Sequence, residues 1–553
     1  MAPERHVNGD SKQSTSAIQD DRPVAPMGMT SHDFETRAAD VVKDISDYYD
    51  TIQDRPVLPA IQPGYLHKLL PSSPPEDGES WSDIRSDIES KIMPGITHWQ
   101  SQKYMAFFPA NATYPSILAE MWSAALTSAN FNWICSPAVT ELETIVMDWM
   151  AQALHLPTQF LSRGTGGGVI QGSASEAVAT VMIAARERYL KALTSSATYS
   201  SPSEQEDAEF ALRGKMVALA SSETHSSAHK AAMITGVRYR SIPTTSATNF
   251  ALTLPAVRET ILSLQSQGLH PFHLTLTLGT TNTCAIDDFA SLSALRSEFP
   301  NLWIHVDAAY AGAALVLPEY AHLTEHFSHF DSFDTNMHKW LLVNFDCSCL
   351  FVQNRRSLTD ALSVTPAYLR NTYTDSGLVT DYRDWQIPLG RRFRALKIWF
   401  VVRTYGVNGM REHIRHHLKL GNLFADLVRT RPDLFEILTP PAFALTVVTV
   451  KARGKKVVAE GQGGDDRGFE ESDKVEGTAG GKGTVGEANE VTKEVYQLID
   501  GEKEIFLTMS VVGGVNAIRV VSANPLAEEK YVRRAFDILV DATERVLTRT
   551  AEP

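Results

Sequence analysis

The sequence is poor in cysteine and has no long apolar run. Its 553 residues include only four cysteines, too few for a disulfide framework, and none has the spacing of a zinc site. No stretch of about 20 apolar residues could span a bilayer. The polar first 29 residues also lack the apolar centre of a signal peptide. We therefore expect a reducing compartment, with the cytoplasm as the default location, no bound metal and no membrane partner.

The sequence also has fewer basic residues than acidic ones. Lysine and arginine total 51 against 65 acidic residues, which gives a formal net charge of −14. This balance argues against nucleic acid or an anionic membrane as the main partner. The hydrophobic content of 43% and the charged content of 21% are those of an ordinary globular protein with a large core.

The chain divides into four predicted parts. We expect a disordered tail at 1–29, an N-terminal helical dimerisation segment at 30–113, a large domain at 114–397, and a small C-terminal α/β domain at 398–553 with a flexible insertion at 452–489. The first helix should run from Ser31, as its cap, to about Ile52, and its apolar stripe needs a partner such as a second subunit. In the large domain, helical periods alternate with short apolar runs, which predicts a mostly parallel sheet.

Two short segments of the large domain carry residues that could bind a cofactor. Leu302 to Val306 form an apolar run that ends at Asp307, so a carboxylate lies at the tip of a buried strand. A lysine, Lys339, follows within Asn336 to Trp340. Pyridoxal 5′-phosphate (PLP) requires a lysine amine for a Schiff base and a carboxylate that keeps its ring nitrogen protonated. Most lysines are only surface charges, so this prediction depends on Asp307 and on the turn described next.

A glycine-rich turn at 164–168 precedes a second apolar run, a Ser-rich turn and a helix. The natural interpretation is that backbone N–H groups at the helix N-terminus meet a phosphate, with Ser175 adding a hydroxyl. The alternative is that Ser173 or Ser175 merely caps the helix. A dinucleotide site is excluded, because the glycines do not lead directly from a strand into a helix.

Two further polar residues follow predicted strands. His225 could stack on a planar cofactor ring and orient the substrate, although such a histidine is more often an ordinary loop residue. Thr281 could contact the cofactor, and its alternative is a simple turn threonine.

Several long motifs resemble those of the aromatic L-amino acid decarboxylases, which are group II PLP-dependent decarboxylases of fold type I. They are HVDAAYAG, NMHKWLLVNFDC, VIQGSASEA, THSSAHKA, SPAVTELE and DYRDWQIPLGRRFRALK. The resemblance covers roughly Ser31 to Lys451 and resumes weakly after Glu504. It implies an α/β fold with a large, mostly parallel sheet of the seven-stranded type, a small C-terminal α/β domain and an N-terminal helical segment exchanged between the subunits of a homodimer, with the active site at or near their interface.

The resemblance also implies roles for individual residues. Lys339 would form the Schiff base, Asp307 would pair with the ring nitrogen, and His225 would stack over the ring. Ala174 and Ser175 would bind the phosphate, with Asn336 and His338 close by, and Thr281 would contact the cofactor. Tyr368, on a mobile loop, would return the proton to the substrate carbon.

The pocket positions of the family match mostly apolar residues in this chain, namely Trp99, Phe107, Phe108, Pro109, Ala129, Phe131 and Gly390. Aromatic walls suit an aromatic side chain. In plant relatives, a glycine at the position of Gly390 accompanies indolic substrates. We therefore expect tryptophan or a substituted tryptophan to be decarboxylated to the arylalkylamine and CO₂, with phenylalanine, tyrosine and DOPA as further candidates.

Two other functions stay open. In aldehyde-forming relatives the loop tyrosine or the stacking histidine is replaced and oxygen intercepts the carbanion, whereas both residues are retained here. Simple decarboxylation is therefore favoured over an aromatic acetaldehyde synthase. A catalytically silent binding protein of fold type I is the non-enzyme alternative.

Overall fold

The computed structural model describes residues 29–195, 197–364, 372–375, 379–452 and 484–549. Contacts divide the chain into two units, residues 1–55 and 56–553, and each is described by itself. The described residues of the first unit form mainly α1 (Ser31–Thr51). We predict Ser31 as its cap, and that prediction is wrong. Thr30 is the N-cap, because its side chain accepts the Asp33 N–H while the Asp33 carboxylate accepts from the Thr30 backbone.

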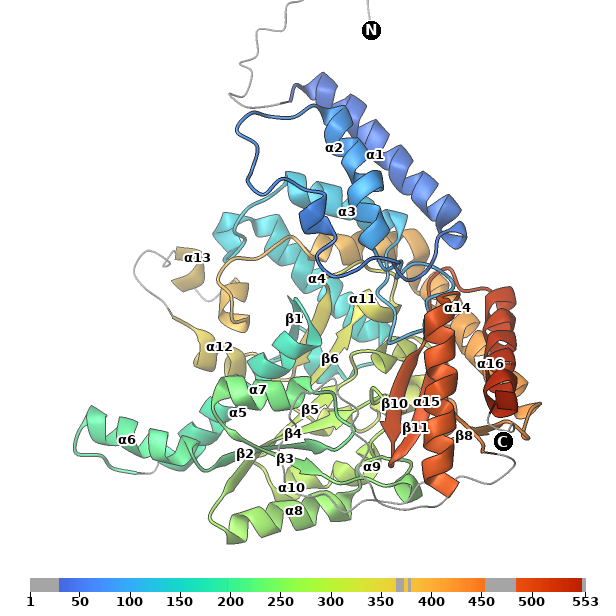
Figure 1. Ribbon diagram of the computed structural model, residues 1–553. Coiled ribbons are helices and arrows are strands. Elements are labelled where there is room, and N and C mark those ends of the chain that lie inside the picture. Colours follow the sequence, from blue (N-terminus) through green and yellow to red (C-terminus); the bar gives the residue numbers. More distant parts are fainter. Residues whose placement is uncertain (1–28, 196, 365–371, 376–378, 453–483, 550–553) are drawn as a thin grey trace, which may run out of the picture. The chain divides into compact units, whose positions relative to one another are not determined.

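The second unit is built on a seven-stranded sheet (Figure 1). Its strands lie in the order β1-β7-β6-β5-β4-β2-β3. All neighbours are parallel except β7, which is antiparallel to both β1 and β6. The strands are β1 (Gly167–Gln171), β2 (Met216–Ser221), β3 (Arg238–Ile242), β4 (His270–Thr277), β5 (Trp303–Asp307), β6 (Ser332–Asn336) and β7 (Ser348–Val352). The mostly parallel sheet predicted from the sequence is confirmed.

This topology places the carboxyl ends of β1, β2, β4, β5 and β6 at one edge of the sheet. Since β7 runs against both of its neighbours, β1 has the same direction as β6. The five residues of each of β1, β5, β6 and β7 are all buried, as expected for strands covered on both faces. Substituents at the tips of these strands therefore converge on one edge.

Helices connect and cover the strands. One apolar cluster joins α5 to strands β2, β5 and β7. It includes Val178 of α5, Trp303 of β5 and Leu350 of β7. The helices of this part are α4 (Pro137–Ala153), α5 (Ala174–Thr194), α6 (Pro202–Arg213), α7 (Ser227–Thr235), α8 (Leu254–Ser266), α9 (Phe289–Leu292), α10 (Leu295–Glu298), α11 (Met337–Trp340), α12 (Arg356–Leu362) and α13 (Thr372–Asp375).

A smaller antiparallel sheet occupies the C-terminal part, in the order β10-β11-β9-β8. Its strands are β8 (Phe435–Ile437), β9 (Leu445–Val450), β10 (Thr508–Val512) and β11 (Val515–Val521). It is accompanied by α14 (Ala395–Arg429), α15 (Thr484–Glu502) and α16 (Glu529–Arg549), and α15 contacts both α16 and β11 (Figure 1). The boundary we predict at 397/398 lies just inside the start of α14.

The predicted insertion at 452–489 needs one correction. Residues 453–483 lie outside the described residues, but 484–489 are the first residues of α15 rather than a loop. They are helical because Ala488 is buried in a cluster with Val515 of β11. This short apolar contact could not be predicted from the Gly- and Glu-rich composition of the segment.

Residues 56–113 join the two sheets. Here α2 (Trp81–Asp87) is capped by the Ser80 side chain, which accepts the Asp83 N–H, and a wider helical turn continues the helix to Ile92. The Met105 N–H donates to the Phe506 carbonyl over 2.9 Å, so this segment runs beside the small sheet. Next along the chain is α3 (Tyr114–Ala125). Among the described residues, no helix combines the length and apolar character that a bilayer crossing requires.

Candidate functional site

Most of the residues predicted to bind a cofactor follow the carboxyl ends of five strands, all at the same edge of the large sheet. His225 follows β2 and Thr281 follows β4, whereas Asp307 is the last residue of β5. Ala174 and Ser175 begin α5 just after β1, and Asn336, His338 and Lys339 lie at the end of β6 and in α11. The sheet therefore gathers residues that are far apart in the sequence into one site.

Lys339 is held in place by the segment before α3. The Asn111 N–H donates to the His338 carbonyl over 2.7 Å, and the Asn111 side chain donates to the Lys339 carbonyl. The Lys339 Nζ lies 5.7 Å from the centroid of the Phe108 ring. That ring stacks on Tyr310 with a centroid separation of 3.7 Å, and Tyr310 stacks on Trp340. The lysine thus emerges beside an ordered aromatic wall.

The surroundings of Lys339 make its amine easier to deprotonate than that of a solvated lysine. Removal from water lowers its pKa below the ordinary value, and the positive charge of Arg519 lowers it further. The carboxylates of Asp307 and Asp334 oppose this shift. A neutral amine is the form that attacks an aldehyde, so the local electrostatics suit a Schiff-base lysine.

Asp307 is a buried carboxylate with 4% of its surface exposed. Its Oδ1 accepts the Ala309 N–H over 3.0 Å, which fixes the side chain at the strand tip. In the sheet it lies opposite Thr277 of β4 and Asp334 of β6. A buried carboxylate in this position can hold a protonated ring nitrogen.

His225 has a defined orientation and a neutral ring. Its Nδ1 accepts the Ser227 N–H over 3.1 Å, which assigns the ring proton to Nε2. Limited access to water lowers the pKa of His225, the Asp307 charge opposes that shift, and the Lys339 charge adds to it. Both charges act on this ring, so the three predicted residues share one site.

The N-terminus of α5 offers free donors. Ser173 is the N-cap, since its side chain accepts the Glu176 N–H over 3.2 Å. Within the described chain, the N–H groups of Ala174 and Ser175 make no hydrogen bond, and the Ser175 side chain is exposed. Ser175 is therefore not the cap, and the first turn of this 21-residue helix can receive an anion.

Asn336 and His338 are both buried near Lys339. The His338 Nδ1 accepts the Cys347 N–H over 2.8 Å, and burial lowers the pKa of His338 to about 3. The ring is consequently neutral with its proton on Nε2. Asn336 Oδ1 has no hydrogen-bond partner among the described residues, so a polar group is needed to complete it. Together, an amine, a carboxylate, an anion site and an orphaned acceptor fit PLP.

The predicted pocket residues form two groups. Trp99 and Phe107 stack with ring centroids 6.0 Å apart, and the buried Phe108 and Pro109 follow them toward Lys339. The second group is Ala129, Phe131 and Gly390, and two backbone hydrogen bonds join the segments that carry them; Ala129 and Gly390 are exposed, whereas Phe131 is half-buried. The Arg391 N–H donates to the Ala129 carbonyl over 2.8 Å, and the Arg383 N–H donates to the Phe131 carbonyl over 3.1 Å. Tyr368 lies outside the described residues.

Sequence reasoning missed Arg519 of β11. It is 2% exposed, it lies 5.2 Å from the Phe108 ring centroid, and its Nε donates to the Asn282 carbonyl over 3.3 Å. Its Nη2 has no hydrogen-bond partner among the described residues. The sequence feature that could have identified it is that Arg519 is the single charged residue in the mostly apolar segment from Val515 to Val521.

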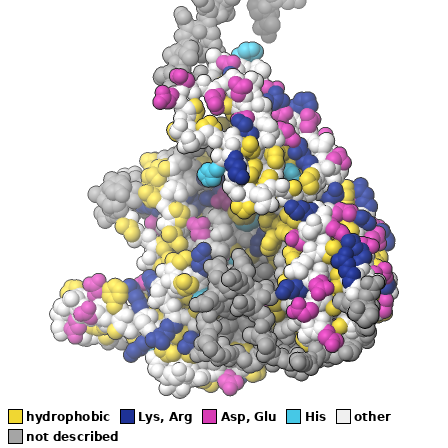
Figure 2. Space-filling view, in the orientation of Figure 1, with side chains coloured by type: hydrophobic (Ala, Val, Ile, Leu, Met, Phe, Trp, Pro, Cys, Tyr) yellow, Lys and Arg dark blue, Asp and Glu magenta, His cyan; other side chains and the backbone are white. Residues whose placement is uncertain are grey.

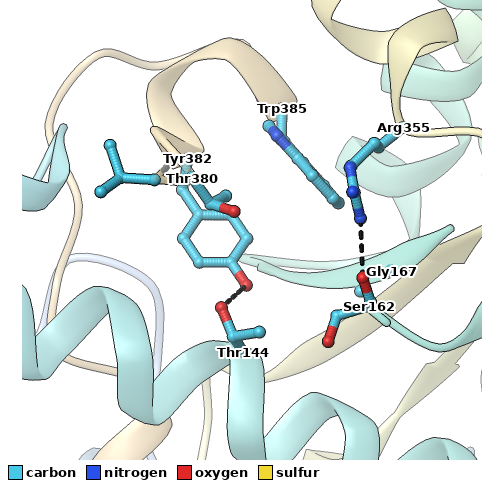
Figure 3. A pocket seen from close by; sticks show the side chains of 9 residues that line it. Thr144, Ser162, Gly167, Arg355, Thr380, Tyr382 and Trp385 are labelled. Atoms are coloured by element: carbon cyan, nitrogen blue, oxygen red, sulfur yellow. Dashed lines mark hydrogen bonds between the residues drawn. The ribbon is translucent and has the colours of Figure 1, made fainter. Parts of the chain in front are cut away.

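A separate cavity of about 210 Å³ lies at the start of β1, away from this edge (Figure 3). Tyr382 and Thr144 meet there through their hydroxyls at 2.9 Å, and Arg355 donates to the Ser162 carbonyl over 2.9 Å. These groups satisfy one another, and none of the predicted site residues lines the cavity.

Comparison with known proteins agrees with this geometry. The model of the pyridoxal-dependent decarboxylase conserved domain matches residues 63–452. The chain is 41% identical over 509 residues to phenylacetaldehyde synthase of Arabidopsis thaliana, covering 91% of this chain and 94% of the relative. It is 45% identical over 425 residues to aromatic-L-amino-acid decarboxylase of Rattus norvegicus, covering 76% and 86%.

Among solved structures, Oryza sativa TDC with PLP and tryptamine matches with a TM-score of 0.85 at 34% identity, over 95% of this chain and 100% of that one. The large sheet and the small antiparallel sheet agree with this match. The chain therefore belongs to the pyridoxal-dependent decarboxylase family, as a PLP-dependent carboxy-lyase of the group that includes aromatic amino acid decarboxylases and aldehyde synthases.

Proposed function

We propose that the protein decarboxylates an aromatic L-amino acid, with tryptophan or a substituted tryptophan preferred, to the arylalkylamine and CO₂. The observation that carries this proposal is the position of the Lys339 amine, which lies beside the Phe108 ring and within the electrostatic reach of Asp307. When bound, PLP supplies an aldehyde for amines and a ring that accepts the electron pair left by departing CO₂.

Each residue of the site would have a separate role in binding the cofactor or the substrate. Lys339 would hold the cofactor covalently, and Asp307 would keep a proton on the ring nitrogen. The neutral imidazole of His225 would lie flat on the ring, with its Nε2–H available to the substrate. The phosphate would bind at the helix start, and the further contacts would come from Ala174, Ser175, Thr281, Asn336 and His338.

The substrate is argued from the shape and polarity of the pocket. Trp99, Phe107 and Phe108 offer stacking surfaces for an aromatic side chain. Gly390 and Ala129 leave room for the larger indole and offer no side-chain partner for a phenolic hydroxyl. The unpaired Arg519 Nη2 suits the carboxylate of an amino acid, which would complete its hydrogen bonds.

Protonation at the substrate carbon decides the product. We assign that proton to Tyr368, with His225 helping to orient the substrate. The similarity to a phenylacetaldehyde synthase makes decarboxylation with oxidative deamination the competing outcome. The presence of both Tyr368 and His225 favours the amine.

We also propose that the enzyme works as a homodimer with its active site at or near the subunit interface. Several apolar side chains of α3 are about half exposed, and Figure 2 shows hydrophobic side chains at the surface between charged ones. These exposed residues of α3 are Tyr114, Leu118, Met121 and Trp122. The exposed positions of Ala129 and Gly390 are consistent with a pocket that a second subunit closes. Cytoplasmic location stays a prediction from the sequence.

Reconstitution with PLP tests the core of the proposal. The wild type should develop an absorbance band at about 420 nm, and Lys339→Ala should not. A panel of L-amino acids analysed by mass spectrometry should then give tryptamine from tryptophan and no product from glutamate. A colourless wild type would refute the site, whereas comparable turnover of glutamate would refute only the pocket.

A further inference from the structure

A second buried carboxylate, Asp334, lies directly beside Asp307. The two residues are register partners on the neighbouring strands β6 and β5, and parallel neighbours lie about 4.8 Å apart. Asp334 Oδ1 is 3.0 Å from His305 Nε2, and neither side chain is exposed to solvent. The other ring nitrogen of His305 lies 2.9 Å from the Ser332 hydroxyl.

This carboxylate is incompletely bonded. Asp334 Oδ2 is buried without a hydrogen-bond partner among the described residues, which is costly for an ionised group. Burial raises the pKa of Asp334 to about 7, the negative charge of Asp307 adds to the shift, and the bond from His305 opposes it. Nothing in the proposed chemistry uses this residue.

We propose that His305 and Asp334 form a positioning pair that shares one proton beside Asp307. The charge of this pair would set the pH at which the ring nitrogen of the cofactor loses its own proton. The inference rests on the proposed contact between Asp307 and that nitrogen. Neither His305 nor Asp334 touches the reacting atoms.

The effect follows from the charge of the pair. With the shared proton, His305 and Asp334 are together neutral, and without it they carry one negative charge. As the pH rises past neutrality, a second negative charge develops beside Asp307. Because a nearby negative charge favours the protonated form of a group, the ring nitrogen keeps its proton to higher pH.

Other charged groups act on the same region and must stay constant in any test. Lys339 favours an ionised Asp334, whereas Asp307 disfavours it. His273 of β4 is buried, and neither of its ring nitrogens has a hydrogen-bond partner in the described part of the chain; its pKa is lowered well below 6.5 by burial and by nearby positive charge. The titratable and charged groups facing the pair are therefore Asp307, Lys339, His273, Arg188 of α5 and Cys349 of β7.

The test is a pH titration of the complete enzyme reconstituted with PLP labelled with ¹⁵N in its ring. The ¹⁵N chemical shift reports protonation of that nitrogen without turnover. In Asp334→Asn, the ring should lose its proton at a pH lower by about one unit than in the wild type. His305→Gln should shift the titration in the same direction, because Asp334 without its histidine stays protonated and neutral.

Asp360→Asn is the control, since Asp360 of α12 is an exposed carboxylate whose partner is Lys191, and neither residue is among the groups that face the pair. It should leave the ¹⁵N titration unchanged. Identical titrations in wild type and both test variants would overturn the inference alone. A ring already unprotonated in the wild type at pH 7 would overturn the role of Asp307 as well. Folded test variants that bind no PLP would make the pair structural and would also overturn it.

Discussion

Replacing Gly390 with serine should change which aromatic amino acid the enzyme prefers. A Cβ built on Gly390 has only the Ala129 carbonyl oxygen nearby, at 4.0 Å, which is an ordinary contact. Gly390 also lacks the left-handed backbone that would make a side chain strained there. The variant should therefore fold normally, and the new group should occupy space that we assign to the indole ring.

The size of the effect follows from the volume added. A methylene-sized change in an apolar pocket alters discrimination by about 1–3 kcal/mol. The hydroxyl also gives a phenolic substrate a hydrogen-bond partner that it lacks in the wild type. We expect the ratio of kcat/KM for tryptophan to that for tyrosine to fall at least about 10-fold, which corresponds to about 1.4 kcal/mol.

The assay is initial-rate kinetics with each amino acid alone, with amines quantified by mass spectrometry. Gly78→Ser is the matched control, because nothing lies within 4 Å of a Cβ at that exposed glycine. Its ratio should stay at the wild-type value. An unchanged ratio in Gly390→Ser, with an unchanged Tm, would refute our account of the pocket.

Three further predictions concern buried charge. Arg519→Gln should raise KM for the amino acid at least about 10-fold while the PLP absorbance band persists, because charged hydrogen bonds contribute about 1.5–3 kcal/mol; an unchanged KM would contradict the carboxylate contact. Glu143→Gln should lower the free energy of unfolding by about 3–5 kcal/mol in urea denaturation, since it leaves the Arg391 guanidinium, 1% exposed, without its carboxylate. The pKa of His338 is lowered to about 3 from an ordinary 6.5, so its contribution to stability is complete above pH 6.5 and decreases as the pH falls below that. Between pH 6 and 5 the unfolding free energy of His338→Gln should therefore fall less than that of the wild type, by about 1 kcal/mol, and equal slopes would contradict the neutral ring.

The sequence predicts the parts of the site that are encoded locally. Asp307 and Lys339 each lie beside an apolar strand, so their placement at strand tips follows from hydrophobic patterning and the usual position of active sites in parallel sheets. The same reasoning places His225 and Ser175. The cap of α5 needed the structure, because Ser173 and Ser175 are chemically equivalent and only backbone geometry distinguishes them.

The remaining residues depend on long-range contacts. Arg519 reaches the site only because β11 packs the small sheet against the Asn282 loop. Asn111 matters because tertiary packing places it beside the backbone of Lys339. Asp334 looks like an ordinary polar residue until the strand register sets it opposite Asp307. Local periodicity carries no information on such pairings.

The start of α15 illustrates a different limit. Residues 484–489 fall within the flexible insertion that we predict at 452–489, because glycine, glutamate and lysine are abundant in that insertion as a whole. The first turns of the helix are held against the small sheet by the buried Ala488 and by Asn489, whose side chain donates to the Gly514 carbonyl over 3.0 Å. Packing against a neighbour outweighed intrinsic propensity there.

The product balance with L-tryptophan tests the central claim most directly. The complete enzyme, loaded with PLP in air-saturated buffer, should release tryptamine and CO₂ in equal amounts, without stoichiometric hydrogen peroxide. That result would mean that the substrate carbon is protonated before oxygen can react. Indole-3-acetaldehyde and peroxide formed in step with CO₂ would contradict the account and identify an aldehyde synthase instead.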